Sequence, residues 1–448
     1  MATGAAFKRY FYQDAAGFLW CEGIRVQSLQ EDLSRRLPRP SRSPFYLYSL
    51  AQVRDNVSRY KEALKTLPNP HILGYSFKAN GNFEMLKTLR GMGCGAVTVS
   101  GNEIRLALTA GFNPDSIVYN GNGKQDWELE LAVRVKCLIN VDSDFDLRHV
   151  RRAADTVRQR ARVLIRINPD IDPKVHPYNC TGLASSKFGL ECSQLPGLLQ
   201  QVHRWPEQLQ LVGLHCHLGS TITDVSLFRD VVSVVSAEME SVRSQGFPDL
   251  QYLNMGGGLG IDYLRQEDSN NPSPAYLVSS IRDALTDKNI CLILEPGRSI
   301  IGDAAILVTK VIGVKGNGEK RFVVTDGSMT EVIRPSLYSA YHHIQLTEPS
   351  QAEDPTERVY DVVGPVCECG DFLGKDRTIP TPHEGCGLAV FDVGAYCSSM
   401  ASNYNMRIRP AEVLVDGATW RIIRRPETLD DMTRCYTGLP PDSFTTHD

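Results

Sequence analysis

Three groups of reactive or anion-binding residues each follow a short apolar stretch of the chain. Lys78 follows the stretch GYSF, Gly256–Gly258 follow YLNM, and Glu295 and Arg298 follow CLIL. A desolvated lysine amine is nucleophilic toward an aldehyde, and the backbone N–H groups of a glycine run can bind an anion. A carboxylate beside a pyridine ring keeps the ring nitrogen protonated. Together these residues predict a site that holds a phosphate-bearing aldehyde cofactor as a Schiff base on Lys78.

Each group also has a plainer interpretation when it is taken alone. Lys78 could be an ordinary surface lysine whose stem packs against the protein, and many glycine runs simply form turns. Glu295 and Arg298 could form a surface ion pair. Their combination at the ends of apolar stretches favours a common site, where Arg298 would bind phosphate or a substrate carboxylate.

A histidine pair lies in the motif HCHLGS, residues 215–220. His215 and His217 share one face of a strand, so a metal pair is conceivable. No third ligand is evident, and we therefore predict no metal site. The flat imidazole of His217 is better explained as a ring that stacks on an aromatic cofactor, and Ser220 could donate to its phosphate.

Candidate substrate-binding residues lie in the last third of the chain. Arg334 begins the run Arg-Pro-Ser-Leu-Tyr, which would present it rigidly with Tyr338 four residues later, an arrangement that suits recognition of a substrate carboxylate. Cys367 and Glu368 are a thiol beside a carboxylate and could act as proton donor and amine acceptor, although a pair of turn thiols is an equal alternative. Tyr396 follows small residues at a strand end and could contact the ring or the phosphate.

The elements that must position these residues are short apolar strands that alternate with amphipathic helices. We predict strands at residues 71–78, 95–100, 116–121, 137–143, 162–168, 211–219, 252–258 and 291–298. Continuous apolar strands with helical crossovers are typical of parallel sheets, and eight such units favour a closed (β/α)8 TIM-type barrel. An open doubly wound sheet is the rival, but no GxGxxG motif follows the first strand. In a barrel all the strand ends that carry polar residues lie on one rim.

Beyond about Gly302 the pattern changes to short β-branched strands separated by turns. This predicts an α/β protein with a second, mostly antiparallel β domain. We predict a cofactor-binding barrel at residues 45–302, and a β-rich domain at 1–44 and 303–448 that carries substrate and dimer contacts. The helix predicted at 49–67 uses Ser49 as its N-cap, and the polar segment 347–357 is expected to be a surface loop.

Composition excludes several classes of protein. The chain has 448 residues with 42% hydrophobic and 22% charged content and a net charge of −4, so a large core is expected and nucleic-acid binding is not. No apolar run approaches the roughly 20 residues that span a bilayer. The twelve cysteines are scattered without CxxC pairs, which indicates reduced thiols. We expect a soluble protein of the cytoplasm, or of the plastid stroma if a leader was removed.

Seven motifs occur along the chain in the order YSFKAN, HCHLGS, GGGLG, EPGR, DGSMTEVIRPSLY, VVGPVCE and DVGAY. In this order they resemble the diaminopimelate decarboxylase family, whose members are barrel enzymes that use pyridoxal 5'-phosphate. The resemblance extends from Tyr12 to Leu439 and is strongest for the plant and algal branch. It implies decarboxylation of meso-2,6-diaminopimelate to L-lysine and CO2, which is the last step of lysine biosynthesis.

The resemblance also implies a role for each matched residue. The catalytic set would be Lys78, His217, Glu295 and Cys367. The cofactor would be bound by Lys78, His217, Ser220, Gly256, Gly257, Gly258, Glu295, Pro296, Gly297, Arg298 and Tyr396. The substrate would be bound by Arg298, Arg334, Tyr338, Glu368 and Tyr396. In the family Cys367 and Glu368 reach across a two-fold axis into the partner's site, which implies an obligate homodimer.

Two departures and three alternatives remain. Val97 stands where many relatives carry an aspartate, and Cys369 stands where they carry a small polar residue. A related ornithine or arginine decarboxylase would bind a purely cationic group and would need acids in place of Arg334. A catalytically inactive regulatory homologue would lack Lys78 or Cys367, and both are present. A racemase needs acid–base groups on both faces of the ring, and only one donor beyond Lys78 is evident.

Overall fold

The computed structural model describes residues 9–176, 180–182, 186–264, 273–348 and 352–438. The chain forms two compact units. One, the barrel unit, comprises Arg54–Asp262 and Asp268–Ile301, and the other, the β-rich unit, comprises Met1–Val53, Tyr263–Glu267 and Gly302–Asp448. Within the described ranges, none of the helices is both long and apolar enough to cross a membrane.

The described part of the barrel unit contains eight parallel strands that are hydrogen-bonded in chain order. They are β5 (His71–Ser76), β6 (Gly95–Thr98), β7 (Ile117–Tyr119), β8 (Leu138–Val141), β9 (Ala161–Asn168), β11 (Leu209–His215), β12 (Tyr252–Asn254) and β13 (Cys291–Leu294). β13 pairs with β5, and β9 pairs with both β8 and β11, so the ring is closed. The predicted (β/α)8 barrel is confirmed, and its rival, the open sheet, is excluded.

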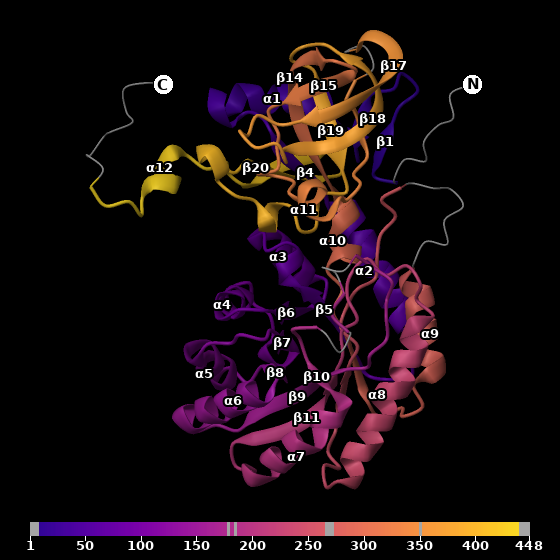
Figure 1. Ribbon diagram of the computed structural model, residues 1–448, viewed down its shortest axis with the longest axis vertical. Coiled ribbons are helices and arrows are strands. Elements are labelled where there is room, and N and C mark those ends of the chain that lie inside the picture. The colour runs from indigo at the N-terminus through magenta and orange to yellow at the C-terminus, as the bar shows by residue number, and fades with distance from the viewer. Residues whose placement is uncertain (1–8, 177–179, 183–185, 265–272, 349–351, 439–448) are drawn as a thin grey trace. The chain divides into compact units, whose positions relative to one another are not determined.

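Amphipathic helices connect the strands and lie around them (Figure 1). They are α2 (Leu50–Leu64), α3 (Phe83–Gly91), α4 (Gly101–Thr109), α5 (Asp126–Arg134), α6 (Asp144–Val157), α7 (Leu195–Arg204), α8 (Leu227–Ser244), α9 (Pro274–Ala284) and the short α10 (Arg298–Ile301). Ser49 caps α2 as predicted, because its Oγ accepts a hydrogen bond from the backbone N–H of Gln52 at 3.0 Å. A short strand, β10 (Leu190–Glu191), adds to the edge of β9.

The interior of the barrel contains an apolar layer contributed by six strands. Its members are Val97, Val118, Leu138, Leu164, Val212 and Ile293. Val97 is therefore a core residue of this chain. An aspartate in its place would bury a charge among aliphatic side chains, which is strongly unfavourable without a partner.

The β-rich unit is built on a mostly antiparallel sheet. Its strands are β1 (Phe11–Gln13), β2 (Leu19–Cys21), β3 (Ile24–Arg25), β4 (Phe45–Ser49), β14 (Ala305–Asn317), β15 (Lys320–Thr325), β16 (Ile344–Leu346), β17 (Ala352–Val363), β18 (Phe372–Pro382), β19 (Gly387–Phe391), β20 (Ala411–Asp416) and β21 (Thr419–Arg424). The main sheet has the order β18-β17-β15-β14-β4-β20-β21, and β19 joins β14 to β16. Only the pairs β15–β17 and β4–β20 are parallel among the described strands of this unit. Its helices are α1 (Val26–Arg36), α11 (Arg334–Tyr338) and α12 (Leu429–Thr433).

Two segments of this unit differ from the sequence-based expectation. Residues 45–53 lie in the β-rich unit instead of the barrel, because β4 pairs with β14 and β20. The opening segment lies in the β-rich unit as expected, where it forms a three-stranded sheet, β1 to β3, whose Phe11 and Leu19 pack into the core of the main sheet. In the segment expected to be a loop, residues 352–357 begin strand β17, and 349–351 lie outside the described residues.

Candidate functional site

Lys78 lies in a single helical turn, Phe77–Ala79, directly after β5. Its neighbours Phe77 and Ala79 are buried, whereas Lys78 itself is exposed, so the amine is not desolvated as the sequence argument required. The turn is anchored to the EPGR segment, because Ser76 Oγ donates to the backbone oxygen of Glu295 at 2.8 Å. A side chain on Gly297 would come within 2.9 Å of Ala79 Cβ. The lysine turn and the EPGR turn are thus packed against each other.

Glu295, which follows β13, is a buried carboxylate with 4% exposure. The side-chain amide of Asn120 donates to both of its oxygens at 3.0 and 2.9 Å, and the Asn254 amide donates to Oε1 at 2.7 Å. Burial raises the pKa of Glu295, while these hydrogen bonds and the charges of Lys78 and Arg166 act in the opposite direction. The carboxylate is therefore held in place by donors from the ends of two separate strands, β7 and β12.

Each of these amides is itself oriented. Asn140 donates to the side-chain oxygen of Asn120, and the backbone N–H of Gly256 donates to the side-chain oxygen of Asn254 at 2.9 Å. Both amide oxygens accept, so both NH2 groups face Glu295. The sequence alone did not single out Asn140 or Asn254. The available signal was an asparagine within or at the end of an otherwise apolar strand.

The two histidines of the HCHLGS motif are both neutral. Burial lowers the pKa of His217 well below its usual range, and the charges of Lys78 and Arg166 lower it further. His215 is fully buried, its Nε2 lies 3.9 Å from Glu295 Oε2, and burial followed by the charge of Arg166 lowers its pKa in the same way. A neutral imidazole can stack on an aromatic ring without adding charge. In the described part of the chain, no three histidine, cysteine or acidic side chains are placed to hold a metal ion.

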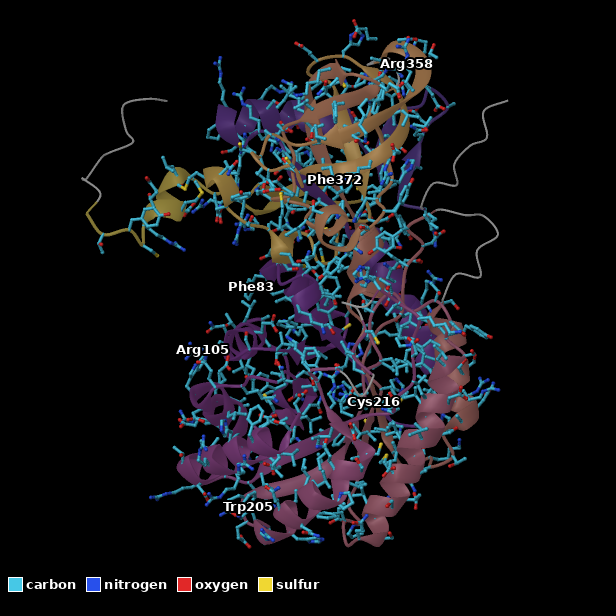
Figure 2. The ribbon with its side chains drawn as sticks, viewed as in Figure 1. Phe83, Arg105, Trp205, Cys216, Arg358 and Phe372 are labelled. Carbon is cyan, nitrogen blue, oxygen red and sulfur yellow. The ribbon has the colours of Figure 1, made fainter. Side chains whose placement is uncertain are left out.

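The residue between these histidines, Cys216, directly follows β11 and is labelled in Figure 2. It is fully buried, and burial raises the pKa of its thiol to about 12. Such a thiol is inert as a nucleophile. Cys216 is therefore a packing residue of the strand end, and all twelve cysteines, each in a described range, are free thiols.

The glycine run after β12 is packed against backbone on both sides. A Cβ on Gly257 would lie 2.3 Å from the backbone oxygen of Glu295, and one on Gly258 would lie 2.5 Å from that of Gly219. Gly256 and Gly258 also have positive φ angles of 64° and 116°, which favour glycine. Glycine is therefore required at these positions because neighbouring backbone lies where a side chain would begin.

Ser220 and Arg298 form a polar pair on the same unit. Arg298 donates to Ser220 Oγ from Nε at 3.1 Å and from Nη2 at 3.0 Å. Arg298 is buried at the start of α10, while Ser220 is half-buried in the loop after β11. The backbone oxygen of Pro296, in the turn with Gly297, accepts a hydrogen bond from the Ser76 N–H at 3.1 Å. The structure thus brings together the barrel residues that the sequence singled out.

The other predicted residues belong to the β-rich unit. Arg334 begins α11 and is only 3% exposed, and Tyr338 ends the same helix and is half-buried. Cys367 and Glu368 are exposed after β17, where the backbone N–H of Cys367 donates to Asn405 Oδ1 at 2.7 Å. Tyr396 is half-buried and has a positive φ of 57°.

Comparison with known proteins identifies the family of this chain. Residues 50–302 match the pyridoxal-binding domain of the pyridoxal-dependent decarboxylases. The chain is 48% identical to the probable chloroplastic diaminopimelate decarboxylase of rice, over 98% of this chain and 87% of the relative. It is 40% identical to the diaminopimelate decarboxylase of Aquifex aeolicus, over 94% and 95% of the two chains. The crystal structure of the Helicobacter pylori enzyme in complex with L-lysine superposes with a TM-score of 0.83 at 36% identity, covering 90% of this chain and 98% of that one.

The chain belongs to the diaminopimelate decarboxylase family. The resemblance, the pyridoxal phosphate cofactor and the enzyme class predicted from the motifs are confirmed, and the rice relative agrees with the plant-like branch. The barrel residues have the chemistry needed to bind pyridoxal phosphate, the cofactor of this family. The buried carboxylate of Glu295 can accept a hydrogen bond from a pyridine N–H, and the guanidinium of Arg298, beside Ser220, can bind a phosphate. The half-buried His217, whose Nδ1 has no hydrogen-bond partner, is a ring free to stack.

Proposed function

We propose that this protein removes CO2 from meso-2,6-diaminopimelate and releases L-lysine, the last step of lysine biosynthesis. The proposal is carried by the buried guanidinium of Arg334, which forms no ion pair with the described residues. An unpaired buried charge is unfavourable by several kcal/mol, so such a site favours a ligand that ends in a carboxylate. Diaminopimelate has this second carboxylate, whereas ornithine and arginine present only a cation at that end.

Bound pyridoxal phosphate supplies an electron sink for the electron pair that remains when CO2 leaves. We propose that Lys78 binds the cofactor's aldehyde carbon and that His217 covers one face of the ring. Glu295 accepts the hydrogen bond of the protonated ring nitrogen, which the amides of Asn120 and Asn254 allow by keeping the carboxylate oriented. The N–H groups of Gly256–Gly258, with the neighbouring Pro296–Gly297 turn, Ser220, Arg298 and Tyr396, hold the phosphate.

Substrate residues act through charge and through proton transfer. We propose that Arg334 binds the distal carboxylate, that Arg298 also binds the substrate, and that Tyr338 and Tyr396 donate hydrogen bonds to it. Glu368 accepts hydrogen bonds from the distal ammonium group, and Cys367 delivers the proton that replaces CO2. The exposure of Cys367 and Glu368 in the single chain supports a homodimer in which each chain lends these two residues to the other.

Two alternative functions have less support. A decarboxylase for ornithine or arginine is disfavoured by the buried cation of Arg334. An inactive regulatory homologue is disfavoured because Lys78 and Cys367 are both present and exposed. We also propose that the protein works in the cytoplasm or, by analogy with the chloroplastic relative of rice, in the plastid stroma.

The deciding experiment measures products from two substrates. The holoenzyme is incubated with meso-2,6-diaminopimelate or with ornithine, and CO2 and amino-acid products are quantified. We expect CO2 and L-lysine in equal amounts from diaminopimelate and little CO2 from ornithine. Faster CO2 release from ornithine would reject the substrate assignment, and a protein that never takes up pyridoxal phosphate would support the inactive regulator. Reduction with borohydride followed by peptide mapping should place the cofactor label on Lys78.

A further inference from the structure

The guanidinium of Arg334 is held by two aromatic side chains that the sequence did not single out. Its Nη1 lies 2.9 Å from Nε2 of His342, and its central carbon lies 4.8 Å from the centre of the Tyr263 ring. Its Nε is buried without a hydrogen-bond partner. All three residues belong to the β-rich unit. The contacts fix where the guanidinium lies without supplying a carboxylate that would neutralise it.

The tautomer of His342 follows from its two partners. Nδ1 lies 2.7 Å from the backbone oxygen of Phe391, and a carbonyl oxygen can only accept, so Nδ1 carries the proton. Arg334 can only donate, so Nε2 must offer its lone pair. His342 is fully buried. The neutral imidazole therefore donates from Nδ1 to a main-chain oxygen and accepts at Nε2 from the guanidinium. Only one orientation of the ring satisfies both hydrogen bonds.

The position of His342 is itself determined by the sheet. The residues that follow it form β16, which pairs antiparallel with β19 from Ile344 opposite Val390. The backbone N–H of Phe391 donates to the oxygen of His343 at 2.9 Å, which continues the ladder up to the histidine. Tyr263 adds an edge contact, with its ring centre 5.5 Å from that of His342 at an angle of 78°. The imidazole that contacts Arg334 is thus itself held by the sheet and by the Tyr263 ring.

We propose that His342 and Tyr263 are positioning residues that hold Arg334 ready for the distal carboxylate and so determine selectivity for substrates that end in one. The inference rests on the proposed function. An arginine side chain has many rotamers, and fixing it in one of them on binding costs conformational entropy. A guanidinium that is already held in place avoids this cost when the ligand binds. Loss of either support should weaken ligands that carry the distal carboxylate and leave ligands without it unaffected.

The test compares two ligands on the holoenzyme by calorimetric titration. L-lysine carries the carboxylate, and cadaverine is the same diamine chain without it. His342→Asn keeps an N–H that can donate to the Phe391 oxygen but has no acceptor that reaches Arg334, whereas His342→Gln restores an acceptor near the position of Nε2. We expect His342→Asn to weaken L-lysine by about tenfold, as loss of a hydrogen bond to a charged group does, and to leave cadaverine unchanged. His342→Gln should recover most of the L-lysine affinity, and KM for diaminopimelate should rise in His342→Asn much more than kcat falls.

Tyr263 provides an independent pair of variants. Tyr263→Phe keeps the ring face and should bind L-lysine like the wild type, whereas Tyr263→Leu removes it and should bind L-lysine several-fold more weakly. If His342→Asn does not fold, as judged by circular dichroism, the Tyr263 pair decides alone. Equal weakening of L-lysine and cadaverine, or none of L-lysine, would overturn the inference. A wild type that fails to prefer L-lysine over cadaverine would instead overturn the proposed function and this inference with it.

Discussion

The side-chain amide of Asn254 donates to the carboxylate of Glu295 across two adjacent parallel strands, with 2.7 Å between Nδ2 and Oε1. Asn254 is the last residue of β12 and is paired with Ile293 of β13, two residues before Glu295. The register of these strands therefore delivers the donor to the acceptor. Burial alone raises the pKa of Glu295, and the amides oppose this rise by stabilising the ionised form.

Asn254→Leu removes this donor while keeping a side chain of similar size. Because the ionised form of Glu295 loses a hydrogen bond, its pKa should rise further, and the carboxylate should become ionised only at higher pH. The acidic limb of the kcat–pH profile should then move to higher pH, and kcat at neutral pH should fall about tenfold. Asn102→Leu, at an exposed position of α4, is the control. An unchanged profile for Asn254→Leu would contradict the role of the amide.

Gly257→Ala tests the packing of the glycine run. The new Cβ would lie 2.3 Å from the backbone oxygen of Glu295, so the two loops must separate. We expect a loss of about 1–3 kcal/mol of stability, typical of overpacking, and loss of cofactor during dialysis. Gly123→Ala, where an added Cβ meets nothing within 4 Å, should retain wild-type stability and cofactor content. Full cofactor retention in Gly257→Ala would show that the loop tolerates separation.

Cys367→Ser separates the role of this thiol from that of its neighbour Cys369. Both thiols are exposed, so neither substitution should affect folding. A hydroxyl is a much weaker acid than a thiol, and loss of a general acid typically lowers kcat by about 10²-fold or more. Cys369→Ser should keep kcat within about twofold. Assays of CO2 release distinguish the two, and a larger defect in Cys369→Ser would move the proton-donor assignment to that residue.

The buried carboxyl group of Glu331 should make the free energy of unfolding depend on pH. Its carboxyl is buried and accepts from the Ser328 N–H at 2.8 Å and the Thr330 hydroxyl at 2.8 Å, and burial raises its pKa to about 7. The folded protein thus binds this proton more tightly than the unfolded chain, so the stabilisation is present below pH 4.5 and is lost as the pH rises to about 7.

The corresponding measurement is urea denaturation of the wild type and Glu331→Gln at several pH values. The wild type should lose up to about 3 kcal/mol of stability between pH 4.5 and 7 through this group. Glu331→Gln cannot titrate and should lack that component while keeping an acceptor for Ser328. Parallel pH profiles for the two proteins would mean that Glu331 ionises normally in the folded state.

The barrel could be predicted from the pattern of strands in the sequence alone. Eight continuous apolar runs separated by helical segments imply parallel strands covered on both sides, and this physical requirement leads to a closed barrel. The sequence did not reveal where β4 belongs, because all five of its residues are buried and a strand buried on both faces has no alternation that tells one sheet from another. Its pairing with β14 and β20 depends on contacts between residues more than 250 positions apart in the chain.

The reactive residues could be read from composition and order, since a lysine, a glycine run and an acid–arginine pair at strand ends have few common explanations. Their supports could not. Asn140, Asn254 and His342 are ordinary in sequence and acquire meaning only from a partner: Asn120, Glu295 or Arg334. The reactivity of a side chain depends first on its residue type, and residue types can be identified directly from the sequence. Orientation and protonation depend on neighbours brought together by strand register and burial, and these exist only once the chain has folded.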